Sequence, residues 1–191
     1  AVDELCEAIE AAVGSPEEYI RIGSELSCGA AYRDRLLQNI SGKATSRSEL
    51  LQILQSKRIY VGTLAAILGR QEIFSMKKFQ LAIIDEASQI LEPQIIGLLP
   101  LFDKFILIGD HKQLSTITLQ EESKSRVANP KLNEIGLLNC RDSFFERLFR
   151  LCQTQGWTNA YDTLTYQGRM HESLSGFVNT HFYESMLHPA N

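Results

Sequence analysis

The stretch Leu81-Ala82-Ile83-Ile84-Asp85-Glu86-Ala87 sets four apolar residues directly before two adjacent carboxylates. An apolar run of this length is typical of a buried strand. Because a buried strand has no use for two carboxylates in its interior, Asp85 and Glu86 should emerge at its C-terminal end. Ligands of open α/β sheets bind at that end. The pair therefore predicts a site, although a solvated turn with two acidic residues fits the same pattern.

The same layout returns further along the chain, where Phe105-Ile106-Leu107-Ile108 runs into Gly109-Asp110-His111-Lys112-Gln113-Leu114. Glycine allows a sharp turn at the strand end, so a second polar cluster would lie beside the first if the two strands are neighbours. A shorter apolar run, Ile59-Tyr60-Val61, precedes both. Near-continuous apolar runs predict strands buried on both faces, as in a parallel sheet flanked by helices. We expect an α/β fold.

The N-terminal part of the chain has helical rather than strand periodicity. Apolar residues recur at three- and four-residue steps from Leu5 onward, and Ser46 with Glu49 forms a capping-box pattern before a second apolar series. No strand pattern is visible there. We therefore predict a helical segment over residues 1–57 and an α/β domain over residues 58–191.

The C-terminal part carries weaker signals. Ser143 begins a capped helix that should run to about Cys152, and Gly156 can end it. Residues 161–165 predict one more strand. Residues 121–138 are the most loop-like interior stretch.

Composition limits the classes of function. The chain has 191 residues, and 19 basic against 23 acidic residues give a net charge of −4, so no global positive field attracts polyanions. This argues against a protein that simply coats nucleic acid. With no long apolar span and no export segment, we expect a cytoplasmic protein. The cysteines show neither a C-x-x-C pair nor zinc-ligand spacing, and we expect reduced, mostly buried thiols at Cys6, Cys28, Cys140 and Cys152.

Three stretches of the chain carry a resemblance to a known family. They are Asp85-Glu86-Ala87-Ser88-Gln89, Gly109-Asp110-His111-Lys112-Gln113-Leu114 and Leu164-Thr165-Tyr166-Gln167-Gly168-Arg169-Met170-His171. In this order they resemble motifs II, III and IV of superfamily 1B helicases, in the branch that contains the nonsense-mediated-decay RNA helicase and the flap-processing nuclease-helicases. The resemblance spans residues 59–187 and implies part of the first RecA-like motor domain of an ATP-dependent helicase that acts on single-stranded DNA or RNA.

The resemblance assigns ATP and Mg²⁺ as cofactors. Asp85, in the Walker B position, would bind Mg²⁺ through water, and Glu86 would be the general base that activates the attacking water. Asp110 and Gln167 would contribute to ATP binding.

Further roles follow from the same resemblance. Gln113 would sense the γ-phosphate, and Arg169 would contact it, since a guanidinium offers a fixed fork of donors to phosphate oxygens. Thr63 would meet the nucleic-acid backbone. The chain departs from the family at Gly168, where an aromatic is usual, and at Glu172, where a proline is common. Glycine loosens the backbone beside Arg169.

A phosphate-binding loop of the form G-x-x-x-x-G-K-[ST] is missing from the sequence. The one Gly-Lys pair, Gly42-Lys43, fails because Leu37 and Ala44 occupy the positions that need glycine and Ser or Thr. The family carries this loop upstream of motif II, so we expect a fragment whose loop precedes it and which alone has little ATPase or unwinding activity.

The missing loop has a structural corollary and leaves an alternative open. In the family, the strand that ends at Asp110 lies between the phosphate-loop strand and the strand that ends at Asp85. One edge of it would therefore be unpaired, which predicts self-association. The alternative function is a non-catalytic module that binds nucleic acid or protein on a degenerate ATPase scaffold. An unrelated α/β hydrolase lacks support, because the chain has no G-x-S-x-G elbow.

Overall fold

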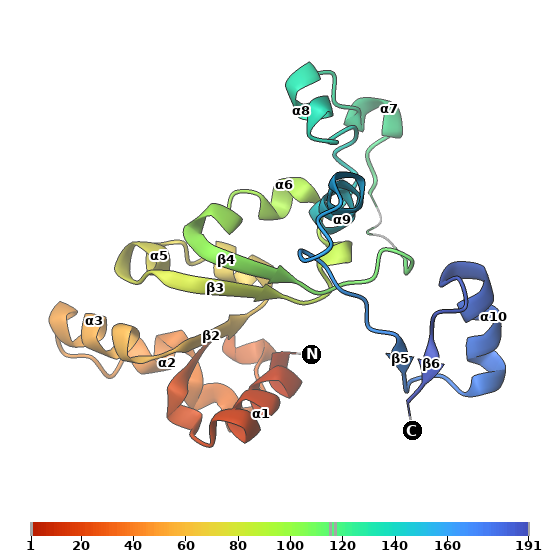
Figure 1. Ribbon diagram of the computed structural model, residues 1–191. Coiled ribbons are helices and arrows are strands. Elements are labelled where there is room, and N and C mark those ends of the chain that lie inside the picture. Colours follow the sequence, from red (N-terminus) through yellow and green to blue (C-terminus); the bar gives the residue numbers. More distant parts are fainter. Residues whose placement is uncertain (1, 115, 117, 191) are drawn as a thin grey trace. The chain divides into compact units, whose positions relative to one another are not determined.

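The computed structural model describes residues 2–114, 116 and 118–190, and the chain divides into two compact units, Ala1–Gln80 and Leu81–Asn191. Helices alternate with short pairs of strands in both (Figure 1). The predicted α/β class is thereby confirmed. The division falls after Gln80, whereas the sequence predicts a boundary after Lys57.

Unit 1 contains one pair of strands and the helices that cover it. Its α-helices and strands are α1 (Val2–Val13), β1 (Tyr19–Ile22), α2 (Leu37–Ser41), α3 (Arg47–Ser56), β2 (Ile59–Gly62), α4 (Leu64–Leu68) and α5 (Glu72–Met76). Short 3-10 helices at η1 (Pro16–Glu18), η2 (Glu25–Ser27) and η3 (Ala30–Arg35) connect them.

Strand β1 was not predicted, so the expectation of helices alone over residues 1–57 is wrong. β1 pairs in parallel with β2, with Tyr19 opposite Ile59 and Ile22 opposite Gly62. The strand was missed because it carries a charged residue, Arg21, that is buried in the fold. The Arg21 guanidinium forms an ion pair with Asp3 and donates to the Ser27 carbonyl. This pairing also explains why the residues after Lys57 belong to unit 1.

Side chains pack on both faces of the β1–β2 pair. On one face, Ile20 and Ile22 join a core with Ile40 of α2, Leu54 of α3 and Ile73 of α5. The other face holds a second cluster, made of Cys6, Tyr19 and Val61. Unit 1 is therefore a small helix–sheet–helix sandwich.

Unit 2 begins within the first strand of a second pair. Its α-helices and strands are β3 (Phe79–Ile84), α6 (Glu92–Ile95), β4 (Phe102–Leu107), α7 (Glu122–Ser125), α8 (Pro130–Glu134), α9 (Phe144–Gln155), β5 (Tyr166–Gln167), α10 (Glu172–Phe182) and β6 (His188–Pro189). Two 3-10 helices, η4 (Ala87–Gln89) and η5 (Leu99–Leu101), lie before and after α6.

Strands β3 and β4 lie side by side and point in the same direction (Figure 1). One face of the pair packs on a core of Ile95, Leu99 and Phe144, contributed by α6, η5 and α9. The other face is open: Ile83 is 63% exposed and Ile106 is 49% exposed. The expected burial on both faces is therefore wrong for these strands, because the cluster that covers them lies on one side.

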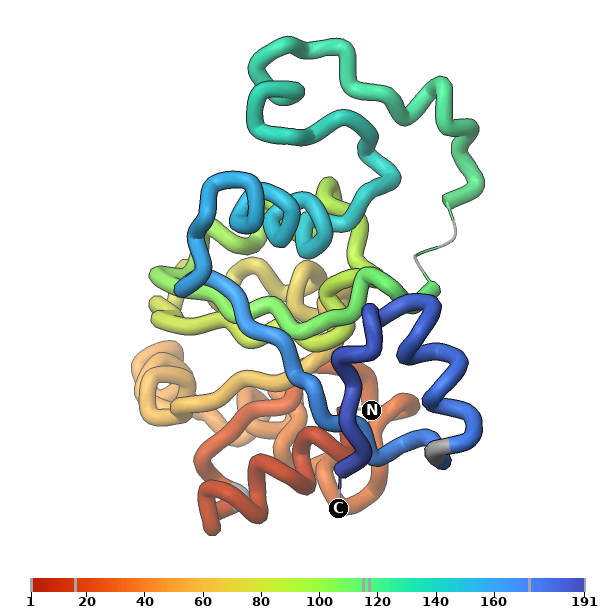
Figure 2. Tube along the Cα trace, turned by 45° about the vertical axis from the view of Figure 1, so that its right-hand side comes forward, coloured from red at the N-terminus to blue at the C-terminus, as the bar shows by residue number. Residues whose placement is uncertain are grey.

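In the C-terminal part of the chain, the predicted helix from Ser143 is confirmed and the predicted strand at residues 161–165 is wrong. Helix α9 begins where Ser143 accepts a hydrogen bond from the Glu146 N–H (3.1 Å) and ends at Gly156, whose φ is 68°. Residues 161–165 are not a strand; the short strand β5 follows them and pairs in parallel with β6. Residues 121–138, expected to be a loop, contain α7 and α8, which lie in the loop of chain at the top of Figure 2, and the Ile135 carbonyl accepts a hydrogen bond from Arg147 of α9.

Two further expectations concern cysteines and membranes. All four thiols are free, and Cys6, Cys28 and Cys152 are buried while Cys140 is exposed. Among the described residues, no helix has the length and apolar character needed to cross a bilayer.

Candidate functional site

The two predicted carboxylates follow β3 directly. Glu86 adopts a left-handed backbone conformation with φ 52°, which costs a non-glycine residue about 1 kcal/mol and is often found at functional sites. Asp85 Oδ1 accepts the Glu86 N–H (2.9 Å), and Glu86 Oε2 accepts the side-chain amide of Gln89 (3.2 Å). Both acidic residues are exposed at this strand end. They are oriented by local contacts and remain accessible to a ligand.

Backbone hydrogen bonds join the end of β4 to the loop after β3. The Ile108 N–H donates to the Ile84 carbonyl, and the Ala87 N–H donates to the Ile108 carbonyl, both at 2.8 Å. Two residues after Ile108, the Asp110 N–H donates to Ser88 Oγ (3.2 Å). The predicted juxtaposition of the two polar clusters is therefore confirmed.

Gly109 is required by this close approach. A β-carbon at that position would lie 2.8 Å from the Ser88 backbone nitrogen and 3.3 Å from the Ala87 nitrogen. Real β-carbons do not approach a backbone this closely, so the glycine lets the two loops touch. The sequence analysis explains Gly109 by the sharp turn that glycine allows. The structure shows a second reason, because the missing side chain leaves room for the loop after β3.

Asp110 is the centre of a hydrogen-bond network. Its Oδ1 accepts the Lys112 N–H (2.9 Å), and its Oδ2 accepts both the Gln113 side-chain amide (3.0 Å) and the Tyr183 hydroxyl (2.5 Å). Burial raises the pKa of the Asp110 carboxyl, but these three hydrogen bonds outweigh burial and hold the pKa below its ordinary value. Asp110 therefore stays ionised and fixes the side chain of Gln113.

The stretch that contains Gln167 and Arg169 forms the turn between β5 and α10. Gln167 exchanges two hydrogen bonds with the backbone of Met170, at 3.0 and 2.9 Å, which close this turn. Arg169 is exposed, and among the described residues it makes no hydrogen bond or ion pair with either strand-end loop. The structure thus brings Asp85, Glu86 and the Asp110 loop together and leaves Arg169 apart from them.

Thr63, predicted to contact nucleic acid, belongs to unit 1. It is the N-cap of α4, where its Oγ1 accepts the Ala66 N–H (3.2 Å), and it is exposed. A threonine at this position is explained by capping, which satisfies an otherwise unpaired amide of the helix.

Two residues of the site were not singled out by sequence reasoning. Ser88 lies inside the quoted motif, and only its position opposite Gly109 shows that its hydroxyl joins the loops. Tyr183 is 73 positions from Asp110 in the sequence, and no local pattern could have paired them.

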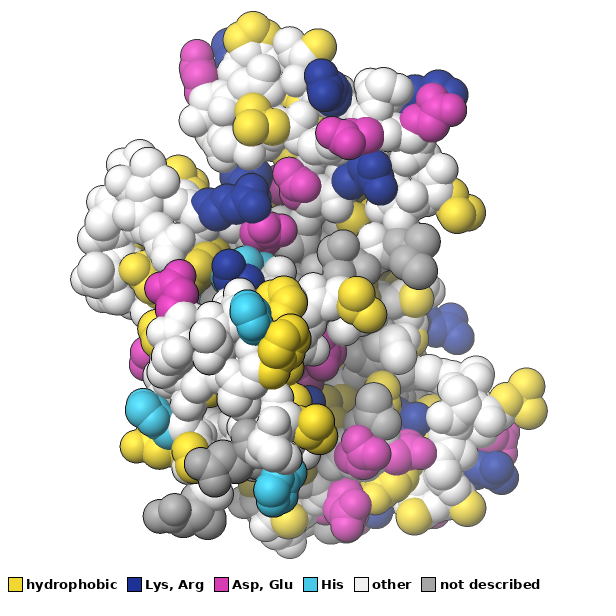
Figure 3. Space-filling view, turned by 90° about the vertical axis from the view of Figure 1, so that its right-hand side faces the viewer, with side chains coloured by type: hydrophobic (Ala, Val, Ile, Leu, Met, Phe, Trp, Pro, Cys, Tyr) yellow, Lys and Arg dark blue, Asp and Glu magenta, His cyan; other side chains and the backbone are white. Residues whose placement is uncertain are grey.

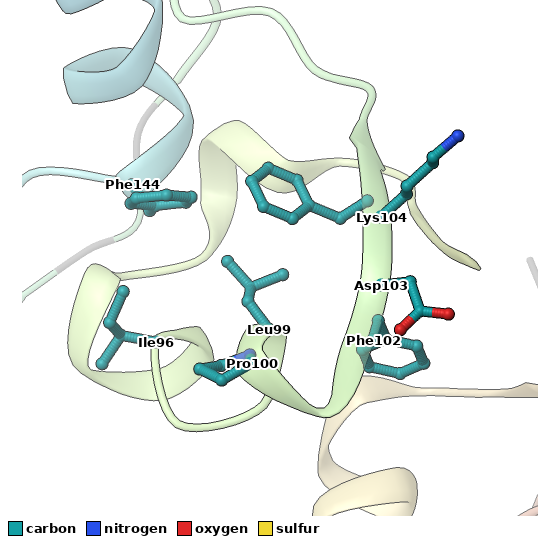
Figure 4. A pocket seen from close by; sticks show the side chains of 8 residues that line it. Ile96, Leu99, Pro100, Phe102, Asp103, Lys104 and Phe144 are labelled. Carbon is teal, nitrogen blue, oxygen red and sulfur yellow. The ribbon is translucent and has the colours of Figure 1, made fainter. Parts of the chain in front are cut away.

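Neither of two hollows in unit 2 is lined by Asp85, Glu86 or Asp110. A groove of about 560 Å³ between η5, β4 and α9 is lined mainly by apolar side chains such as Leu99, Phe102 and Phe144 (Figure 4). A smaller polar hollow of about 290 Å³ includes Ser88 and Arg141. Among the described residues, no group of three or more His, Cys, Asp or Glu is arranged to hold a metal ion.

An α/β domain that places two carboxylates and an Asp-Gln loop on neighbouring strand ends has the layout of the open α/β proteins that bind ligands at this edge. Comparison with known proteins agrees with this class. The family model described as AAA domain matches residues 18–121, more than half of the chain. The chain belongs to this AAA domain family and is a superfamily 1 helicase motor-domain segment with a RecA-like α/β fold.

Relatives of the chain include proteins named as helicases. The chain is 32% identical to the DNA replication ATP-dependent helicase/nuclease of Bos taurus over 76% of its own length and 12% of the relative's. It is 34% identical to the ATP-dependent helicase upf1 of Schizosaccharomyces pombe over 59% of its length and 10% of the relative's. It is 36% identical to the regulator of nonsense transcripts 1 homolog of Neurospora crassa over 59% of its length and 9% of the relative's. The chain thus spans a small part of each of these relatives.

Proposed function

We propose that this chain is part of an ATP-dependent motor that couples Mg-ATP hydrolysis to movement along single-stranded DNA or RNA and to unwinding. The observation that carries the proposal is the contact between the loops after β3 and β4. It sets Asp85 and Glu86 beside the loop that bears Asp110 and Gln113. Relatives named as ATP-dependent helicases support the same reaction.

The donor set at the end of β3 fits Mg²⁺. This ion prefers oxygen ligands and keeps several waters, so one or two carboxylates together with nucleotide phosphates are enough to hold it. Asp85 would hold it, and the bound ion would neutralise charge on the phosphates. Glu86 would accept the proton of the attacking water, since its carboxylate is exposed and is held by Gln89.

The remaining residues act on the γ-phosphate and on the nucleic acid. The Gln113 amide, fixed by Asp110, would contact the γ-phosphate from the loop after β4. Arg169 and Gln167 would approach ATP from the turn after β5, and closure onto ATP would bring them to it. Thr63 would contact the nucleic-acid backbone from unit 1. A cytoplasmic location is part of the proposal, and imaging of a tagged chain in cells tests it.

We further propose that the 191-residue chain alone has little ATPase activity, because its sequence contains no G-x-x-x-x-G-K-[ST] loop to cradle the phosphates. The test is phosphate release, with and without single-stranded nucleic acid, for this chain and for a version extended at its N-terminus through such a loop. We expect turnover from the extended protein alone. Turnover by the 191-residue chain would contradict the proposal of inactivity, and no turnover by either protein would contradict the motor.

The alternative function is a non-catalytic module that binds nucleic acid or protein. The absence of the phosphate loop from the sequence favours it. In the same assay, such a module would bind single-stranded nucleic acid but would hydrolyse no ATP after extension.

A further inference from the structure

The hydrogen bond from Tyr183 to Asp110 joins two parts of unit 2 that are distant in sequence. Asp110 lies directly after β4, and Tyr183 is the C-cap residue of α10. The two are 73 positions apart, and the donor–acceptor distance is 2.5 Å. A hydroxyl that donates to an ionised carboxylate forms a short, charge-assisted hydrogen bond, about twice as strong as a neutral one.

Tyr183 is held firmly on its own side of this contact. Its N–H donates to the Asn179 carbonyl (3.0 Å), and the Asn179 side chain exchanges two hydrogen bonds of 2.9 Å with the backbone of Leu187. The chain reverses direction through Glu184 and Ser185, both in the left-handed region with φ 52° and 62°. The end of α10 is therefore a tight, cross-bonded turn.

The same turn leads into β6, which is bonded to the segment that carries Arg169. The His188 N–H donates to the Thr165 carbonyl (2.7 Å), and the Ala190 N–H donates to the Gln167 carbonyl (2.8 Å). Gln167 in turn closes the turn that contains Arg169. A continuous set of hydrogen bonds thus runs from the turn that contains Arg169, through β6 and the end of α10, to Tyr183 and Asp110.

On the other side of the contact, Asp110 holds Gln113. The oxygen that accepts the Tyr183 hydroxyl also accepts the Gln113 side-chain amide (3.0 Å), and the Gln113 N–H donates to the Asp110 carbonyl (3.2 Å). Any movement of Tyr183 away from Asp110 removes a donor from the carboxylate that orients Gln113.

We propose that Tyr183 is a positioning residue, whose hydroxyl fixes the ionised Asp110 and thereby links the Gln113 loop to the segment that carries Arg169. The network stands on the hydrogen bonds alone. The role of this network in nucleotide sensing rests on the proposed function, because that function assigns Gln113 and Arg169 to the γ-phosphate. Tyr183 itself would touch neither nucleotide nor nucleic acid.

The electrostatics of the two groups agree with this role. Burial and the hydrogen bond to Asp110 raise the pKa of the Tyr183 phenol to about 12. Burial raises the pKa of the Asp110 carboxyl, and hydrogen bonds from Tyr183, Lys112 and Gln113 more than compensate, so that its pKa is lowered. Loss of the hydroxyl should therefore raise the pKa of Asp110.

The test is NMR of the 191-residue chain and of Tyr183→Phe, which keeps the ring and removes the hydroxyl. The Lys112 amide reports the Asp110 carboxylate, to which it donates. In Tyr183→Phe, we expect the acid titration of the Lys112 amide to move to higher pH. We also expect hydrogen exchange of the Gln113 side-chain amide to be about fivefold faster in Tyr183→Phe. This factor corresponds to the loss of one net hydrogen bond.

Two further variants make the result decisive. Tyr161→Phe removes another half-buried phenol hydroxyl and should leave both readouts at wild-type values. Asp110→Asn should abolish the titration, which assigns it to Asp110. A packing role for the Tyr183 ring would leave the titration unmoved in Tyr183→Phe, and that result would overturn the proposal.

The readouts separate this proposal from the proposed function. Neither NMR measurement requires ATP, so an extended protein without turnover would remove the motor assignment and leave the network standing. If the extended protein does turn over ATP, Tyr183→Phe should lower kcat several-fold with little change in KM. Equal kcat in Tyr183→Phe and Tyr161→Phe would show that the network does not serve catalysis.

Discussion

The two units of this chain differ in how completely each encloses its apolar side chains. In unit 1, both faces of the β1–β2 pair are covered, and Ile20, Leu54 and Tyr19 are fully or almost fully buried. Among the described residues, the exposed large apolar side chains of unit 1 are Leu5 and Leu26, and all others lie in unit 2. Exposed hydrophobic side chains are visible as yellow patches in Figure 3.

The candidate site therefore lies in the unit whose core covers its strands on one face, and the more completely enclosed core lies in unit 1. Unit 1 resembles an ordinary small domain, because burial of apolar area is the main favourable term in its folding. Unit 2 carries Asp85, Glu86 and Asp110, and it also contains a buried ion pair. Its buried Arg147 donates two hydrogen bonds of 2.7 Å to Glu92 and one of 2.7 Å to the Ile135 carbonyl.

The largest expected effect comes from breaking this buried ion pair. Arg147→Met leaves the Glu92 carboxylate, which is 4% exposed, without its cation and should destabilise unit 2 by about 3–5 kcal/mol. Fluorescence of Trp157, the single tryptophan and a residue of unit 2, measures the transition in urea.

The matched control is Arg150→Gln, which removes a surface partner of Glu146 and should cost less than about 1 kcal/mol. Equal effects of the two substitutions would show that the buried pair does not stabilise unit 2.

The next effect concerns the core of unit 1. Leu54 is 1% exposed, and Leu54→Ala should destabilise unit 1 by about 3 kcal/mol through lost burial and the cavity that remains. Far-UV circular dichroism should then show an earlier transition while the Trp157 transition stays in place. A parallel shift of both signals would mean that the units unfold together.

A smaller effect is expected at β4, the edge strand of the β3–β4 pair in unit 2. We propose that the edge of β4 away from β3, which pairs with no strand in the described part of the chain, causes self-association, since unpaired edges pair with other chains. Ile106→Lys places a charge on this edge strand and should weaken association about tenfold in sedimentation equilibrium. Leu5→Lys, at an exposed position of unit 1, should not. A wild-type chain that is monomeric at all concentrations would contradict the proposal.

The smallest effect comes from the end of α9. Gly156 has a φ of 68°, and Gly156→Ala should cost about 1 kcal/mol because a β-carbon strains the left-handed conformation. Trp157, the next residue, reports the change directly. Gly176→Ala, in the middle of α10, has open space around the added β-carbon and should be neutral or stabilising. Equal destabilisation by both substitutions would exclude the backbone explanation.

Local signals predicted part of this fold well. The apolar runs before Asp85 and Gly109 predicted β3, β4 and the meeting of their ends, because strand length and turn chemistry are properties of short stretches. Ser143 and Gly156 predicted the limits of α9 for the same reason. Strand β1 escaped prediction because Arg21 is buried only through partners elsewhere in the chain. The predicted strand at residues 161–165 is wrong, because pairing with β6 selects Tyr166 and Gln167 instead.

Long-range contacts of the site could not be predicted. The residues that follow β3 and β4 were identified from their types and order, but the Asp110–Tyr183 hydrogen bond joins groups that no periodicity relates. The chemical roles assigned to Glu86, Gln113 and Arg169 stay predictions.

The proposed function requires that the carboxylates at the end of β3 take part in ATP hydrolysis. It is tested most directly by Glu86→Gln in a protein extended through a phosphate-binding loop, with Glu134→Gln, an exposed carboxylate of α8, as control. We predict that Glu86→Gln lowers phosphate release roughly 100-fold or more while ATP still binds, because the general base is lost. Phosphate release equal to that of the control would contradict the claim.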